Sequence, residues 1–280
     1  MHVSNKAGQS QHELLELLFS GLPDSSGNIV LCDEANRVAG QFSPSQVDDI
    51  QALAEGNNSQ YFRVCLMDDT VIGNKQGGKS TATTIVCLPL DVDCSKPGHV
   101  SRDDAFDVLT GMDDPPSIIV NSKGKDGGFH AYWLLDSPVT FSASQTVEDA
   151  QARLDGLADR VRTLLAKKPC TPDDKGNYIV LDAGQTLYRL MRPTGTTRDN
   201  GNSVSIEWQS DRAYNLSDFE PASVAEPTIT TSQEPSLASV SDLSYSNGTE
   251  TVDDFNSQWS SVEHIVAVMQ SQGHQVWKAG

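Results

Sequence analysis

The feature that most constrains this 280-residue chain is an apolar, β-branched run over residues 84–93 that ends in two aspartates. The run is typical of a buried strand, and it leads into Asp91, Val92 and Asp93. Side chains alternate faces along a strand at about 3.3 Å per residue, so the two carboxylates share a face with Cα atoms roughly 7 Å apart. Two carboxylates at the end of a buried strand are costly unless they are paired or bind a metal. The pair predicts either a site for a hard cation such as Mg²⁺ or Mn²⁺, or an exposed strand end that runs into an acidic turn.

Charge and cysteine usage narrow the class of protein. Lysine and arginine number 20 against 38 aspartates and glutamates, and the formal net charge of -18 excludes a global basic field, although not a local basic groove. The five cysteines are scattered without a C-x-x-C pair, which indicates reduced thiols and neither a zinc ribbon nor a redox motif. The N-terminus has no signal-type apolar region, and no apolar run approaches the roughly 20 residues of a membrane span. We therefore expect a cytoplasmic protein with no membrane partner.

Hydrophobic periodicity predicts helices and strands in alternation. An amphipathic helix over 144–168 is the clearest element, and it carries core residues and no chemistry. Ser43-Pro44-Ser45-Gln46 predicts a capped helix start, with Ser as the N-cap and Gln at N3, and this helix runs to about residue 55. The other predicted helices cover residues 11–19 and 101–109. The predicted strands cover residues 28–32, 61–66, 81–90, 117–121, 129–135, 177–182 and 203–209.

Residues 73–80 match the phosphate-binding pattern G-x-x-x-x-G-K-S, but we predict that they do not form a P-loop. A P-loop requires a helix directly after it, because the helix N-terminus faces the phosphates. The segment that follows here, from Thr81, is β-branched and predicts a strand. We interpret the pattern as a glycine-lysine hairpin loop, in which Lys75 and Lys79 are candidate phosphate contacts.

Two further stretches carry polar groups at strand ends. A glycine-rich turn after Ser122 joins two predicted strands and leads into His130, although a strand histidine by itself is more often a core residue. Asp182 ends an apolar run and is followed by Arg189 and Arg192. Carboxylates with hydroxyl and basic groups suit a nucleoside triphosphate held by divalent metals, since arginine binds phosphate bidentately.

In this order the motifs resemble the archaeo-eukaryotic primase superfamily, in its phage and plasmid primase-polymerase branch. The first motif of that family, an apolar strand ending in D-x-D, is matched by residues 90–93. The second, a small residue and glycines before a strand histidine, is matched by residues 122–133 with His130. The third, an aspartate before an R-x-P-G-T element, is similar to Asp182 followed by residues 192–196, in which the proline and threonine are transposed.

The resemblance covers about residues 10–210, and it implies both a fold and an activity. The implied fold is α+β or α/β, with a central mixed or antiparallel sheet flanked by helices, as in a modified RNA-recognition-like core. The implied activity is that of a DNA primase or polymerase, which uses a single-stranded DNA template to transfer nucleotides from dNTPs or NTPs to a primer or an initiating nucleotide, with release of pyrophosphate, in the replication of a phage, plasmid or other mobile element. Two Mg²⁺ or Mn²⁺ ions are the implied cofactors. A helicase module or other replication proteins in a bacterial or archaeal host cell are the implied partners.

The resemblance also assigns roles to individual residues. Asp91, Asp93 and Asp182 would be catalytic and hold the metals, with Asp173 and Asp174 as competitors for the third position. One set would bind the nucleotide: Ser122, His130, Lys123, Lys125 and Arg192. Another would contact nucleic acid: Lys75, Lys79, Arg189 and Arg198.

Two rival functions use fewer of these residues. A metal-dependent glycosyltransferase would use the D-x-D pair to hold Mn²⁺ and a nucleotide-sugar diphosphate, but it needs neither His130 nor the 192–196 element. A non-catalytic replication adaptor would bind nucleic acid through a decayed site, yet the three carboxylates are retained. Primer synthesis with a template and nucleotides distinguishes these functions.

A change in composition predicts a domain boundary. Serine, threonine, proline and glutamate dominate residues 221–253, which predicts a disordered linker after a catalytic domain over 1–220. Residues 254–280 regain a helical pattern that is too short to bury a core alone. We expect this helical segment to begin a further module or to dock on a partner.

Overall fold

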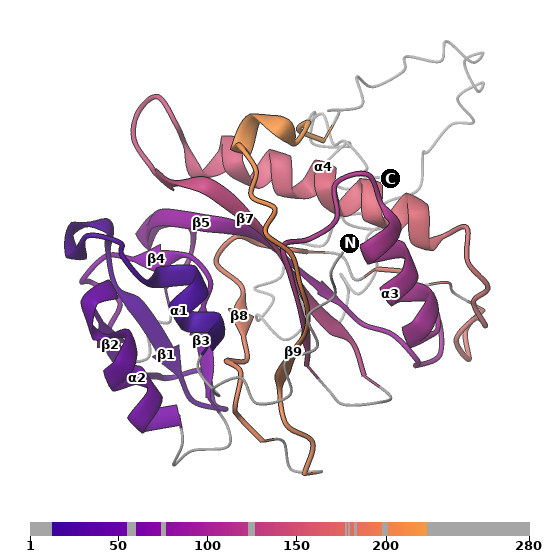
Figure 1. Ribbon diagram of the computed structural model, residues 1–280, viewed down its shortest axis with the longest axis horizontal. Helices are drawn as coiled ribbons and strands as arrows, with labels where there is room; N and C mark the ends of the chain where they lie inside the picture. The colour runs from indigo at the N-terminus through magenta and orange to yellow at the C-terminus, as the bar shows by residue number, and fades with distance from the viewer. Residues whose placement is uncertain are drawn as a thin grey trace, which may run out of the picture. The chain divides into compact units, whose positions relative to one another are not determined.

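The fold is built from two antiparallel sheets and a few helices (Figure 1). The computed structural model describes residues 13–54, 60–73, 77–122, 127–176, 178, 180–181, 184–197 and 201–222. All strand pairs of the two sheets in these residues are antiparallel, so the predicted α+β class is confirmed. Two sheets take the place of the one central sheet that the sequence predicted.

The smaller sheet joins segments from both ends of the described part of the chain. Its strand order is β2-β1-β3-β8. The strands are β1 (Ile29–Cys32), β2 (Val38–Phe42), β3 (Tyr61–Arg63) and β8 (Leu190–Met191). Helices α1 (Glu13–Phe19) and α2 (Val47–Ala54) belong to this part of the fold (Figure 1). The pairing of β8 with β3 brings Arg189 and Arg192, which flank β8, to the N-terminal part of the chain.

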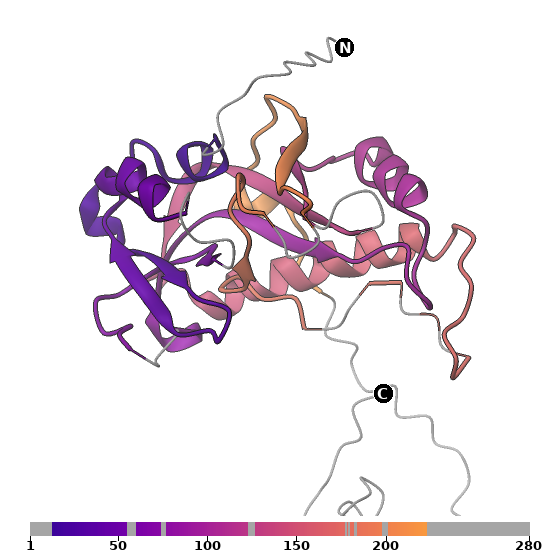
Figure 2. The ribbon, with the colours of Figure 1, turned by 90° about the horizontal axis from the view of Figure 1, so that it is seen from below.

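The larger sheet carries the predicted D-x-D strand next to one of its edge strands. Its strand order is β4-β5-β7-β6-β9. The strands are β4 (Leu66–Met67), β5 (Ala82–Val92), β6 (Ile118–Asn121), β7 (Phe129–Thr140) and β9 (Ser205–Gln209). The two remaining α-helices of the described residues are α3 (Arg102–Gly111) and α4 (Val147–Leu165). Figure 2 shows α4 lying along the strands of this sheet.

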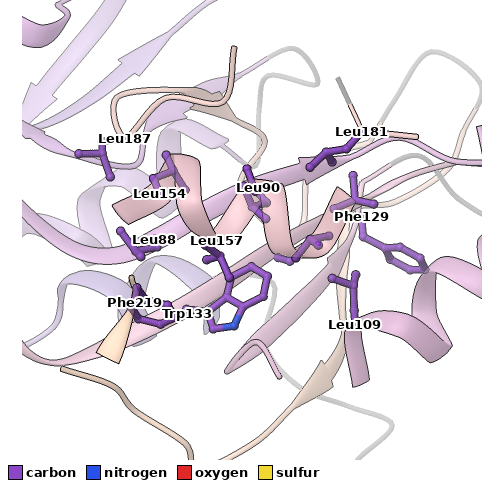
Figure 3. Packing of buried hydrophobic residues seen from close by; sticks show 14 of the residues in the cluster. Leu88, Leu90, Leu109, Phe129, Trp133, Leu154, Leu157, Leu181, Leu187 and Phe219 are labelled. Atoms are coloured by element: carbon purple, nitrogen blue, oxygen red, sulfur yellow. The ribbon is translucent and has the colours of Figure 1, made fainter. Parts of the chain in front are cut away.

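Alternation along β5 and β7 separates two apolar clusters. Leu88, Leu90 and Trp133 pack with side chains of α4 such as Leu154 and Leu157 (Figure 3). The neighbouring residues Cys87 and Tyr132 belong to a second cluster, which includes Phe62 of β3 and Met191 of β8. After the register shift between Ile85 and Cys87, the odd-numbered side chains of β5 therefore face away from α4 and toward the smaller sheet. Tyr132 and Trp133 are both fully buried, so they are core residues and not base-stacking platforms.

Most predicted elements are confirmed, and the exceptions involve short strands. Ser43 and Gln46 form the predicted capping box, in which Gln46 Oε1 accepts the Ser43 N–H at 3.0 Å. The strand predicted over 61–66 is wrong, since it is two strands, β3 and β4, that belong to different sheets. The chain crosses between the sheets at Val64 and Cys65, which are buried in opposite clusters, so a continuous apolar pattern conceals the break. Strands β2 and β8 were not predicted.

Two other predictions concern segments that are described only in part or not at all. Within the strand predicted over 177–182, residues 178, 180 and 181 are described, and they lie outside strands. The linker over 221–253 and the helical segment over 254–280 lie outside the described residues from position 223 onward and stay predictions. Among the described residues, no helix has the length and apolar character needed to cross a membrane.

Candidate active site

The register of the larger sheet brings two of the predicted motifs together. Asp91 of β5 lies directly opposite His130 of β7, and His130 lies opposite Val120 of β6 on its other side. Directly opposed residues of antiparallel strands project to the same face, so the Asp91 and His130 side chains share the face that is turned away from α4. Asp93 follows the end of β5, and its side chain is buried.

A glycine allows the hairpin turn to reach the aspartate pair. A Cβ atom at Gly128 would lie 2.3 Å from the Val92 carbonyl oxygen and 2.9 Å from the Asp93 Cα, so only glycine fits without moving the backbone. The Ser122 side chain secures the same turn, because its Oγ donates a hydrogen bond to the Gly128 carbonyl at 2.9 Å. Ser122 is buried and has this structural role, and its role in nucleotide binding stays a prediction.

The carboxylate of Asp91 is only half satisfied by the described residues. Its Oδ2 accepts a hydrogen bond from Arg189 Nη2 at 2.8 Å, and the two side chains are 18% and 24% exposed respectively. Its Oδ1 is buried and accepts no hydrogen bond from the described residues. A buried, negatively charged oxygen without a donor is costly, so this atom marks a place where a cation or a further donor would be stabilising.

Gln185 is a residue of this site that the sequence analysis missed. Its Oε1 accepts the Asp91 backbone N–H at 3.0 Å, and its Nε2 donates to the Asp91 carbonyl at 3.2 Å. The carboxamide thus replaces a neighbouring strand for one residue of β5. Gln151 of α4 holds the same segment through bonds to the Gln185 carbonyl (2.8 Å) and the Leu187 N–H (3.2 Å). No local pattern marks Gln185, because its partner lies 94 residues earlier in the chain.

The two aspartates differ in how they are neutralised. Asp93 Oδ2 lies 2.6 Å from Lys96 Nζ, and the Lys96 side chain is 45% exposed. Because Lys96 follows Asp93 by three residues, this ion pair is local and partly screened by solvent. Arg189 reaches Asp91 from another part of the chain and is more buried.

Arg192 is tied to the smaller sheet. Its guanidinium lies 4.4 Å from the centroid of the Tyr61 ring, and its Nη2 donates to the Tyr61 hydroxyl at 2.6 Å. The R-P-T-G-T element that starts at Arg192 forms a turn, in which Gly195 has a φ of 84° and Thr196 Oγ1 donates to the Pro193 carbonyl at 2.8 Å. A residue with a side chain is strained at this positive φ, so the turn requires glycine at position 195.

Lys79 lies away from the aspartate pair. It begins the short 3-10 turn Lys79–Thr81 before β5, whereas Asp91 is near the other end of this strand. An extended strand of this length spans roughly 35 Å. Lys79 forms an ion pair with Glu148 at 2.7 Å, on exposed side chains. Because β5 follows the turn in place of an α-helix, the prediction that residues 73–80 do not form a P-loop is confirmed for the described part, 77–92.

Several predicted site residues lie outside the described residues, namely Lys75, Lys123, Lys125, Asp182 and Arg198. Their roles stay predictions. Asp173, a competitor of Asp182, accepts the Lys175 N–H through Oδ1 at 2.9 Å within a local turn. Gln185, which binds the Asp91 backbone, follows Asp182 by three residues in the sequence.

The donor atoms of the pair fit a divalent cation. Asp91 and Asp93 offer carboxylate oxygens, which hard cations prefer, and Asp91 Oδ1 is a buried oxygen in need of a positive partner. The described residues contain no group of three or more His, Cys, Asp or Glu side chains suited to a metal. A metal site would therefore combine this pair with water, substrate oxygens or residues outside the described part, such as Asp182.

Comparisons with known proteins yield structural similarity only. No protein-family model matches the chain, and no curated protein matches it. The structure is similar to the AEP domain of the primase-polymerase of cyanophage S-2L, with 14% identity and a TM-score of 0.47 over 74% of this chain and 94% of that one. It is also similar to the catalytic domain of primase RepB′ in complex with initiator DNA, with 14% identity and a TM-score of 0.37 over 67% of this chain and 79% of that one. Both of those proteins are primases.

Proposed function

We propose that this chain is a nucleotidyltransferase that synthesises or extends primers on single-stranded DNA, as a primase or primase-polymerase of a phage, plasmid or other mobile element. The observation that carries the proposal is the register that sets Asp91 opposite His130, with Arg189 paired to the same aspartate. This arrangement places an acidic pair, an imidazole and a guanidinium at one end of one sheet. A nucleoside triphosphate needs these three kinds of group, which serve its metal ions and its phosphates.

In the proposed reaction, a primer 3′-hydroxyl attacks the α-phosphorus of a dNTP or NTP, and pyrophosphate leaves. Asp91 and Asp93 would hold Mg²⁺ or Mn²⁺, with Asp182 as the proposed third carboxylate. When bound, such ions supply Lewis-acid stabilisation of phosphate charge and lower the pKa of an attacking hydroxyl. His130, on the same face as Asp91, would hydrogen-bond a phosphate oxygen, and Arg192 would add positive charge at the neighbouring turn.

The other predicted site residues would contribute to nucleotide and template binding. Ser122, Lys123 and Lys125 belong to the turn before His130 and are proposed to contact the triphosphate. Lys75, Lys79 and Arg198 are proposed template contacts. A helicase module or other replication proteins would be the partners. A global net charge of -18 requires that template binding be local, since the overall field repels DNA.

Primer synthesis on a single-stranded template tests the proposal. The purified chain is incubated with template, labelled dNTPs or NTPs, and Mg²⁺ or Mn²⁺, with and without a primer. We expect labelled product that Asp91→Asn abolishes, because the change removes a ligand charge while keeping the side-chain volume. Asp33→Asn is the matched control, since Asp33 also pairs with an arginine, Arg37, but lies on the surface at the β1–β2 turn.

The result separates the proposal from its rivals. Synthesis that depends on Asp91 but not on Asp33 supports it. Template binding without synthesis, unchanged in Asp91→Asn, would instead indicate a non-catalytic adaptor. Hydrolysis or transfer of a nucleotide-sugar without any primer product would indicate a glycosyltransferase.

A further inference from the structure

Arg189 pairs with Asp91, a carboxylate that the proposed metal site needs. Its Nη2 lies 2.8 Å from Asp91 Oδ2, so the guanidinium provides the positive charge next to this carboxylate. The contact is long-range, across 98 residues, and both side chains are largely shielded from solvent. A shielded ion pair is screened less than a surface pair, and Arg189 therefore competes directly with any other cation for Asp91.

The structure holds both partners of this pair in place. Gln185 binds the backbone N–H and carbonyl of Asp91 and so fixes the residue that bears the carboxylate. The same Gln185 Oε1 lies 3.5 Å from Arg189 Nη1, whereas Asp91 Oδ2 binds Arg189 Nη2. The guanidinium thus donates to both Asp91 Oδ2 and Gln185 Oε1. Only Oδ1 of Asp91 is left without a donor from the described residues.

We infer that Arg189 is a tethered counter-cation for Asp91, which it releases when the carboxylate takes a divalent ion, and that the released guanidinium then binds the phosphates of the nucleotide. The inference rests on the proposed function and adds an ordered exchange to it. In the absence of metal, Arg189 neutralises an otherwise costly buried charge. In its presence, Arg189 lies next to the nucleotide that the metal accompanies, and its planar fork suits phosphate oxygens.

This exchange predicts effects of opposite sign for one substitution. Without Arg189 the metal has no competitor at Asp91, although Lys96 still pairs with Asp93, so Arg189→Gln should bind Mn²⁺ more tightly in the absence of nucleotide, by about fivefold for a pair of this exposure. The same variant lacks the released guanidinium, so its apparent KM for nucleotide should rise by about tenfold or more. If Arg189 had a purely structural role, its replacement would weaken the binding of both Mn²⁺ and nucleotide.

Mn²⁺ binding is measured on the full chain, without nucleotide, by the loss of the electron paramagnetic resonance signal of free Mn²⁺. Arg37→Gln is the matched control, because Arg37 also pairs with an aspartate and its loss changes the net charge equally, away from the site. We expect its Mn²⁺ affinity to equal that of the wild type. Circular dichroism checks folding, and if Arg189→Gln does not fold, Arg189→Lys replaces it. Lysine lacks the fork that spans Asp91 and Gln185, so this variant should bind Mn²⁺ about twofold more tightly.

The outcomes decide the inference separately from the proposed function. Unchanged or weaker Mn²⁺ binding in the Arg189 variant, with binding still abolished by Asp91→Asn, overturns the inference and leaves the metal site intact. An equal gain in Arg37→Gln also overturns it, because net charge and not exchange would then set the affinity. Absence of any Mn²⁺ binding in the wild type overturns the inference and the proposed metal site together.

Discussion

Replacing Gly128 with alanine tests whether the hairpin turn positions the aspartate pair. The added methyl group would lie 2.3 Å from the Val92 carbonyl oxygen, 2.9 Å from the Asp93 Cα and 3.0 Å from the Val92 carbonyl carbon. All three atoms belong to the backbone, so no side chain can rotate away. An ordinary carbon–oxygen contact is about 3.3 Å, and the turn and the end of β5 must therefore separate by about 1 Å.

Two consequences follow from that displacement. Strain of this kind in a packed region costs about 1–3 kcal/mol of unfolding free energy, which lowers the Tm by roughly 3–9 °C for a domain of this size. The displacement also moves the backbone that carries Asp93, and a misplacement of about 1 Å at a reacting centre can reduce the rate about 100-fold. We therefore expect Gly128→Ala to fold with a modestly lower Tm, while its rate of primer synthesis falls about 100-fold.

Gly111→Ala is the matched control, because a Cβ atom there meets nothing within 4 Å. Thermal unfolding and primer synthesis are measured on both variants. The control should have an unchanged or slightly higher Tm and full activity, since alanine restricts the unfolded chain without a clash. A Gly128→Ala variant with wild-type Tm and wild-type synthesis would refute the close approach of the turn to the aspartate pair.

Three further predictions address neighbouring groups. Gln185→Ala should lower the unfolding free energy by about 2–4 kcal/mol in urea titrations, because the backbone N–H and carbonyl of Asp91 both lose their partner. A loss under about 0.5 kcal/mol would contradict these two hydrogen bonds. His130→Ala should raise the apparent KM for nucleotide by about tenfold or more without changing single-strand affinity, whereas a large drop in Tm with unchanged KM would make it a core histidine. Burial raises the pKa of the Cys65 thiol from 9.0 to about 12, so the folded state is favoured while the thiol is neutral. This contribution is complete below pH 9 and is lost as the pH rises to 12, and urea unfolding across that range should show a shallower decline in Cys65→Ala than in the wild type.

Local chemistry explains what could be predicted before the structure. The β-branched run before Asp91 specifies a strand, and its alternation places the leucines on one face and the aspartates on the other. The glycine-rich segment before His130 specifies a hairpin, so β6 and β7 were expected as neighbours. The Ser43 capping box was recognised because its partners lie three residues apart. Each of these features depends on interactions within a few residues.

The failures occur where short strands pair with distant parts of the chain. Residues 61–66 look like one apolar strand, yet β3 pairs with β1 and β8, while β4 pairs with β5. Strand β8 has only two residues, so it has no periodicity to detect. Neither the crossing between sheets nor the partner of such a strand is encoded in local alternation.

The sequence by itself determined the acidic pair, the strand that bears it and the hairpin that leads into His130, because side-chain periodicity and turn chemistry are local properties. Only the tertiary structure decided the partners of these groups. The register of β5 with β7 sets Asp91 against His130, and the contacts of Gln185 and Arg189 with Asp91 span 94 and 98 residues. Such contacts form when packing of the whole chain offsets the entropy of closing long loops, and no short stretch of sequence contains that balance.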